Sequence, residues 1–186
     1  TELQNFILNN HDRAVQALIE MIHDEKEKNL HKWRAILWLR GPKKAEEKKQ
    51  ARDAFAKYLS DKGCNQGMLI IASAEALGSM GDEKSIKYLI NYYKGFLKGT
   101  NKGCDRWHVI KVLTKFKRDD VIELFLKALS DKEEVVRQYA VTALGEWKVK
   151  KAASPIKKLL ETETDFEVTM AAKKSLEKIA ADNKEN

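Results

Sequence analysis

The densest group of basic side chains in this chain lies between residues 98 and 118. Lysine and arginine side chains contact phosphate oxygens, and several of them close together give a salt-dependent affinity for nucleic acid. If the protein binds nucleic acid, we expect the contact here; the alternative is an ordinary solvated basic surface. The basic residues of this region are Lys98, Lys102, Arg106, Lys111, Lys115, Lys117 and Arg118.

A second polar set comes from five helical segments that share one pattern of apolar residues. In each segment the third and seventh positions lie on one face, because residues four apart are neighbours on a helix. This moderately basic face suits an acidic peptide or a phosphate backbone. The alternative needs no ligand, because Asp53 with Lys57 and Glu123 with Lys127 have the spacing of stabilising pairs within a helix. The candidate binding residues are Lys57, Lys87, Asn91, Lys127 and Lys158.

Residues that support catalysis are not combined here in the patterns that catalysis needs. The sequence has no glycine-rich phosphate loop and no recognisable serine or cysteine nucleophile. His11 and His23 each precede an aspartate, but they lie at opposite ends of one predicted helix and cannot hold one ion. Cys64 and Cys104 are too few for a disulfide framework, so we expect free thiols in a reducing cytoplasm. We therefore expect no catalysis, no metal and no cofactor.

Leucines recur through the chain at nearly constant intervals. The anchor leucines Leu77, Leu113, Leu144 and Leu176 are separated by 36 (113−77), 31 (144−113) and 32 (176−144) residues. A period in this range is typical of stacked helical repeats, in which each unit buries its apolar face against the next. Four residues before each leucine lies a small or β-branched residue: Ser73, Val109, Ala140 and Ala172.

Each repeat is predicted to be a pair of helices. The second helix of each pair has apolar residues at i, i+3 or i+4 and i+7, which makes one buried stripe. A short opening helix and a closing helix from about 165 to 180 complete the set, and residues 181–186 form a frayed tail. The first helices begin near Leu30, Gly67, Cys104 and Glu133, and the second helices cover residues 14–22, 51–59, 85–93, 121–129 and 152–160.

Helix ends are marked by capping residues and by glycine or proline. Gly41-Pro42 and Gly81-Asp82 predict stops. A short side-chain oxygen followed three residues later by glutamate has the spacing of a capping box, and proline suits a first helical position. The predicted starts of this kind are Ser130 with Glu133, Asp131 with Glu134, Thr164 with Glu167, and Ser154 before Pro155.

These segments resemble HEAT repeats, in the short bacterial and archaeal form known from phycobilin lyases. The resemblance implies an all-α fold: a right-handed α-solenoid, or armadillo-like α-α superhelix, of about five helical hairpins in a single domain over residues 1–180. The unit around Leu113 departs from the family pattern at Asp105 and Thr114. The resemblance is carried by Val136-Arg137 through Ala143-Leu144-Gly145, and by Ala76-Leu77-Gly78-Ser79-Met80-Gly81-Asp82 followed by Ser85-Ile86.

The resemblance implies a scaffold with a concave face, lined by the second helices, rather than one activity. Two other functions of similar proteins stay open: a subunit of a pigment (bilin) lyase, and a DNA-glycosylase-like enzyme that presses tryptophans against a damaged base. Core packing is the alternative explanation for the tryptophans. The di-iron members use adjacent His-Glu pairs, which this chain lacks. The residues for a glycosylase-like site would come from Trp33, Trp38, Trp107, Trp147 and the segment Asp105-Arg106-Trp107-His108.

The positive net charge of the chain favours acidic binding partners. The formal net charge of +7 is concentrated in the first two-thirds of the chain, which favours acidic proteins or nucleic acid. No apolar run reaches the roughly 18 residues of a membrane helix, and we expect no membrane partner. We therefore expect a cytoplasmic, non-catalytic scaffold that binds another protein with an acidic or polar surface. Nucleic-acid binding is the alternative, and the oligomeric state is left open.

Overall fold

The computed structural model describes residues 11–41, 44–61, 67–98 and 106–182. Within these ranges the chain forms helices joined by turns and loops, without a β-strand, so the predicted all-α class is confirmed. Among the same residues, each helix is too short or too polar to span a bilayer. The predicted opening helix, Cys64, Lys102, Cys104 and Asp105 lie outside the described residues.

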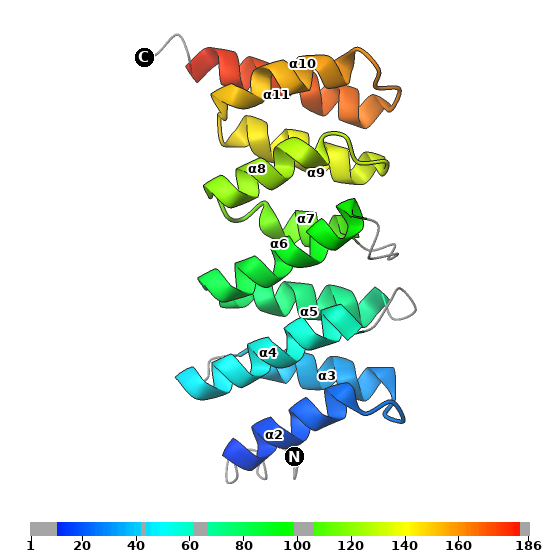
Figure 1. Cartoon of the computed structure of the whole chain (residues 1–186), viewed down its shortest axis with the longest axis vertical. Helices are drawn as coiled ribbons and strands as arrows, with labels where there is room; N and C mark the ends of the chain where they lie inside the picture. Colours follow the sequence, from blue (N-terminus) through cyan, green and yellow to red (C-terminus); the bar gives the residue numbers. More distant parts are fainter. Residues whose placement is uncertain (1–10, 42–43, 62–66, 99–105, 183–186) are drawn as a thin grey trace. The chain divides into compact units, whose positions relative to one another are not determined.

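Contacts within the chain divide it into two compact units, residues 1–105 and 106–186. In the first unit two rows of helices pack against each other (Figure 1). One row holds α2 (His11–His23), α4 (Ala45–Asp61) and α6 (Glu83–Leu97), and the other holds α3 (Asn29–Leu39) and α5 (Gly67–Met80). The first row contains the predicted second helices of the repeats. The single domain expected over residues 1–180 stays a prediction.

The second unit repeats the same plan. Helix α7 (Arg106–Leu113) packs on α9 (Glu134–Glu146), and α9 packs on α11 (Phe166–Asp182). The other row holds α8 (Asp119–Ala128), which contacts α9, and α10 (Ala153–Leu160), which contacts α11. A short 3-10 helix, η2 (Lys150–Ala152), leads into α10. Alternation between the two rows is the organisation that the leucine period predicted.

The anchor leucines mark the core of each unit. Leu77, Leu113 and Leu144 are fully buried, and so are the four small or β-branched residues that precede the anchors. Leu176 is half-buried because α11 is the last helix of its unit. The spacing of four residues therefore identifies the side chains that one helix buries against its neighbours.

A close approach of two backbones fixes the contact between α9 and α11. A Cβ added to Gly145 would lie 2.7 Å from Ser175 Cα and 2.4 Å from its Cβ, so only a hydrogen atom fits there. The Ser175 hydroxyl is buried and donates to the carbonyl of Val141 at 3.0 Å. Glycine at this position lets the two helices pack closely.

The predicted stop at Gly81-Asp82 is confirmed. Gly81 has a φ of 63° and donates its N–H to Leu77 O at 3.2 Å, which closes α5 with a left-handed residue. Asp82 then caps α6, accepting a hydrogen bond from Ser85 N at 2.9 Å.

Three predicted helix starts are wrong by a few residues. Asp165, and not Thr164, caps α11 by accepting from Val168 N at 2.9 Å. Glu133 precedes α9, and the Asp131 carboxylate accepts from Glu133 N at 3.0 Å as well as from Arg106. Ala152 precedes α10, which places Ser154 inside the first turn of that helix.

Candidate functional site

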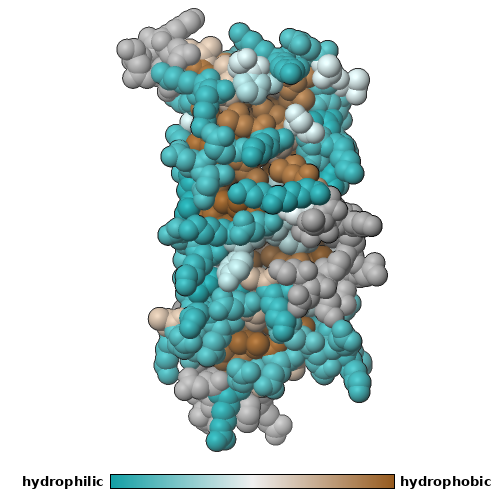
Figure 2. Space-filling model, in the orientation of Figure 1, coloured by the Kyte–Doolittle hydropathy of each residue, from teal (hydrophilic) through white to brown (hydrophobic). Residues whose placement is uncertain are grey.

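The shared face predicted for the second helices is exposed in every one of them. Hydrophilic side chains cover most of the face seen in Figure 2, with apolar side chains visible between them. Exposure of both template positions in five helices confirms which face of the row meets solvent. The ten exposed residues are Gln16, Glu20, Asp53, Lys57, Lys87, Asn91, Glu123, Lys127, Ser154 and Lys158.

The five candidate binding residues divide between the two units. Lys57 on α4, with Lys87 and Asn91 on α6, belongs to the first unit. Lys127 on α8 and Lys158 on α10 belong to the second. A hollow adjoins the candidates in each unit, and the two hollows differ in chemistry.

The α4–α6 cleft in the first unit is lined by charged and polar residue types and has a volume of about 320 Å³. Residues at i, i+3 and i+4 of α4 face residues at i, i+3, i+4 and i+7 of α6, so each helix presents one stripe to the cleft. This spacing brings side chains more than thirty positions apart in sequence to one place. The cleft is lined by Lys49, Arg52, Asp53, Lys84, Lys87, Tyr88 and Asn91.

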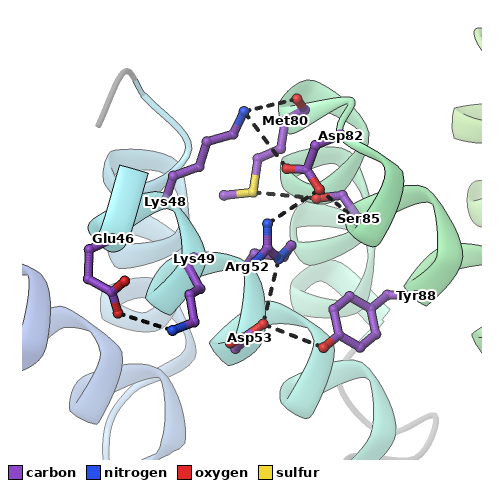
Figure 3. A network of polar contacts seen from close by, with 9 residues as sticks. All are labelled: Glu46, Lys48, Lys49, Arg52, Asp53, Met80, Asp82, Ser85 and Tyr88. Carbon is purple, nitrogen blue, oxygen red and sulfur yellow. Dashed lines mark hydrogen bonds and ion pairs between the residues drawn. The ribbon is translucent and has the colours of Figure 1, made fainter. Parts of the chain in front are cut away.

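A network of polar contacts holds the two walls of the cleft together (Figure 3). Arg52 Nη1 donates to Asp82 Oδ1 at 3.3 Å, which ties α4 to the start of α6. Lys48 Nζ donates to the carbonyl of Met80 at 3.3 Å and lies 3.8 Å from Asp82 Oδ2. Arg52 is only 8% exposed, so its charge stabilises the contact between the two walls and is little accessible to a ligand.

The pKa of the Asp82 carboxyl lies below its usual value. Burial acts to raise this pKa, but hydrogen bonds from Ser85 and the charges of Arg52 and Lys48 together outweigh burial. The carboxylate is therefore ionised at neutral pH and holds the two cations in place.

A carboxylate of the cleft is bound from the opposite helix. Tyr88 on α6 donates its hydroxyl to Asp53 Oδ1 on α4 at 3.4 Å, and Arg52 Nε lies 3.6 Å from the same oxygen (Figure 3). Arg52 Nε has no hydrogen-bond partner. Asp53 is half exposed, so the cleft carries one accessible negative group among its cations.

The lysines of the cleft are held loosely or not at all. Lys87 Nζ lies 2.7 Å from Glu83, and Lys49 Nζ lies 3.4 Å from Glu46, in pairs exposed on both sides. Exposed pairs contribute about 0–1 kcal/mol, so an incoming anion can replace them. Lys84 has no carboxylate partner among the residues that the structure describes.

The pairs within the second helices, which are the alternative explanation for this face, are not the main contacts of their carboxylates. Asp53 binds Tyr88 rather than Lys57. Glu123 accepts from Lys151 Nζ at 2.5 Å, and this hydrogen bond is the main reason why the pKa of Glu123 is lowered, with a smaller effect from Lys127. Other elements thus supply the hydrogen-bond donors of both carboxylates, Tyr88 for Asp53 and Lys151 for Glu123.

The α8–α10 hollow in the second unit has a volume of about 390 Å³ and an apolar floor. Its floor consists of Leu126, Leu129, Pro155 and Leu159. The candidate Lys158 also lines it. The remaining lining residues are polar: Ser130, Asp131, Arg137, Thr162, Glu163 and Thr164.

An ion pair closes one wall of this hollow. Arg137 donates from Nε and Nη2 to the two carboxylate oxygens of Glu163 at 2.7 and 2.8 Å. The Glu163 side chain is only 2% exposed. The hydrogen bond from Arg137 is the main cause that lowers the pKa of Glu163, against the opposing effect of burial.

The basic region between residues 98 and 118 does not form one surface of free cations. Arg106 is 7% exposed; its Nε and Nη2 donate to Asp131, and Nη1 lies 3.0 Å from Glu133. Burial and pairing therefore argue against Arg106 as a phosphate contact. Arg118 binds Asp120 through two hydrogen bonds of 3.0 Å. Lys102 lies outside the described residues, and Lys98, Lys111, Lys115 and Lys117 are exposed.

Two of the four tryptophans, Trp107 and Trp147, pack against other rings. Trp147 stacks on Phe125 with ring centroids 5.4 Å apart, which supports the core alternative for this residue. Trp107 lies parallel to Tyr139 at 6.3 Å and stacks on His108. Lys111 Nζ lies 6.0 Å from the Trp107 ring. Nearby side chains thus already cover part of Trp107.

Within the described ranges, no three histidine, cysteine or acidic side chains come together as a metal site would require. The two hollows offer charge, hydrogen bonds and apolar contact.

Comparison with known families identifies the repeat. The HEAT-repeat family matches residues 102–177, which include every described helix of the second unit through most of α11. This part of the chain thus matches HEAT repeats, as the sequence resemblance predicted. No curated protein shows significant similarity to the chain.

Proposed function

We propose that the protein is a non-catalytic HEAT-repeat scaffold that binds an acidic segment of another protein through the exposed face of its second helices. The observation that carries this proposal is the α4–α6 cleft. There, lysines from two helices surround a hollow whose walls are already held by Arg52, Asp82 and Lys48. A preformed surface avoids much of the entropy cost of ordering a binding site.

Lys84 and Lys87 are the expected contacts for carboxylates of the partner, with Asn91 able to donate and accept hydrogen bonds beside them. Complementary charge also speeds association, and salt weakens it. Lys57, Lys127 and Lys158 extend the same chemistry along the second helices of their units.

Nucleic-acid binding is the second candidate function. Lys111, Lys115 and Lys117 are exposed within one short stretch, and Lys111 lies beside Trp107. Phosphate contacts from three lysines would give binding that weakens steeply with salt.

The test is fluorescence anisotropy with two probes: a labelled peptide of alternating Glu and Ser, and a labelled DNA duplex. Both are titrated from about 50 to 200 mM salt. We expect the peptide to bind, and Lys84→Glu to weaken that binding about tenfold. Lys173→Glu makes the same charge change on exposed α11 and is the matched control.

Two results would overturn the proposal. Tight duplex binding without peptide binding, abolished by reversing the charges of Lys111, Lys115 and Lys117, would assign the protein to nucleic acid. Failure to bind either probe at low salt would remove recognition through the basic face altogether.

A further inference from the structure

The floor of the α8–α10 hollow keeps apolar surface exposed. Leu126, Pro155 and Leu159 are half-buried, and Leu129 closes the bottom at 3% exposure. Filling such a concave apolar surface with another apolar group removes both from water and is favourable. The lining of the α4–α6 cleft contains no leucine or proline, so the two hollows offer different side chains to a ligand.

A lysine lines this hollow without a committed partner. No carboxylate among the described residues lies within ion-pair distance of Lys158 Nζ. The other charged groups are engaged: Arg137 binds Glu163, and Asp131 binds Arg106. A ligand therefore meets an apolar floor and a single available positive charge.

We propose that the α8–α10 hollow binds an apolar side chain of a partner segment whose adjacent residue is acidic. The apolar side chain fills the floor, and the adjacent carboxylate pairs with Lys158. The hydroxyls of Ser130, Thr162 and Thr164 line the hollow and can bond to the backbone of the segment.

This inference rests on the proposed function and restricts the kind of partner segment that the second unit can bind. Acidic charge alone suffices for the α4–α6 cleft, whereas the second unit requires an apolar anchor next to the charge. Anchors that fill a pocket usually dominate the affinity of an interface.

The test uses three immobilised pools of peptides, random except for a fixed central pair: Leu-Glu, Ala-Glu or Leu-Lys. We expect the full chain to be retained on the Leu-Glu pool about tenfold more than on either of the others. Lys158→Glu should reverse the charge preference and favour Leu-Lys. Lys157→Glu changes the adjacent exposed residue, which does not line the hollow, and should keep the original order.

Circular dichroism first establishes that each variant is folded. Equal retention on Leu-Glu and Ala-Glu, or the same effect from Lys157→Glu as from Lys158→Glu, would overturn the inference. If the Leu-Glu preference is lost in Lys84→Glu and kept in Lys158→Glu, the α4–α6 cleft is responsible. The proposed function then stands while this inference fails.

A second copy of the chain is the other possible occupant, because Phe166 is 70% exposed and is followed by Glu167. Analytical ultracentrifugation of the protein without peptide distinguishes self-association from binding of a partner segment. A dimer that dissociates in Lys158→Glu and persists in Lys157→Glu would show that the hollow is filled by self-association, which would overturn the inference. A monomer at all concentrations agrees with it.

Discussion

Arg106 and Arg137 lie at equivalent positions of successive repeats and make the same kind of contact. Each stands seven residues before an anchor leucine, Leu113 or Leu144. Each sits near the start of its helix and reaches a carboxylate in the loop before the next helix of its row: Asp131 for Arg106 and Glu163 for Arg137. Arg137 also donates to the backbone carbonyl of Asp131 at 2.8 Å. Asp131 therefore contacts both arginines and links the two ion pairs.

Breaking the second of these contacts should be costly. Glu163→Ala leaves the Arg137 guanidinium largely buried without its carboxylate, and we expect a loss of about 3 kcal/mol in the free energy of unfolding. Urea denaturation followed by circular dichroism measures it. Glu83→Ala removes an exposed pair with Lys87 and should cost less than about 1 kcal/mol. Equal losses in the two variants would contradict a structural role for the Arg137–Glu163 pair.

The same pair predicts a dependence of stability on acid. Because the folded-state pKa of Glu163 is depressed, chiefly by the hydrogen bond from Arg137, its contribution is present above the unfolded value of about 4.3. The contribution disappears as pH falls through the lower folded pKa. We therefore expect the stability difference between the native chain and Glu163→Gln to shrink between about pH 5 and pH 2. Urea midpoints measured along this range test it; a constant difference would mean that the carboxylate charge is not involved.

Gly145 should not accept a side chain. Gly145→Ala forces a methyl group against the Ser175 backbone, and we expect a loss of about 1–3 kcal/mol in the free energy of unfolding. Gly41→Ala is the control, since its Cβ would meet only Trp38 O at 3.5 Å. Thermal unfolding of both variants measures the contrast, and a Gly145→Ala protein as stable as Gly41→Ala would show that α9 and α11 can move apart.

The substitution Ser73→Ala should increase the stability of the fold. Its buried hydroxyl has no hydrogen-bond partner, and two of the equivalent positions, Ala140 and Ala172, are already alanine. Removing an unsatisfied buried hydroxyl should stabilise the fold by about 1 kcal/mol. Ser79→Ala, at an exposed serine whose hydroxyl donates to Glu75 O, controls for helix propensity. If the gain in Ser73→Ala does not exceed the gain in Ser79→Ala, the hydroxyl is satisfied in solution.

The helices and their exposed face could be predicted because both depend on local periodicity. Residues four apart share a face in any helix, so the exposure of Asp53 with Lys57, or of Glu123 with Lys127, follows from spacing alone. Which cation those carboxylates meet does not follow from spacing, because Tyr88 and Lys151 arrive from other elements.

Arg106 shows why the density of basic residues in the sequence is a poor guide to phosphate contacts. Its place among nearby lysines makes it a candidate phosphate contact in the sequence, but it is buried. Its alignment with Arg137, seven residues before an anchor leucine, was the available signal for a shared structural role. The α8–α10 hollow had no such signal, since Leu126 and Leu159 occupy ordinary core positions of their helices and only tertiary packing leaves them partly uncovered.

Because Arg137 pairs with Glu163 in the loop after α10, proteolysis in this loop should affect the stability of the second unit. A protease that cut before Glu163 would remove the only carboxylate paired with this arginine among the described residues and strand a cation inside the remaining fragment. Damage at the C-terminal end would thus destabilise helices well upstream of the cut. We therefore expect the second unit to be lost cooperatively after such a cut.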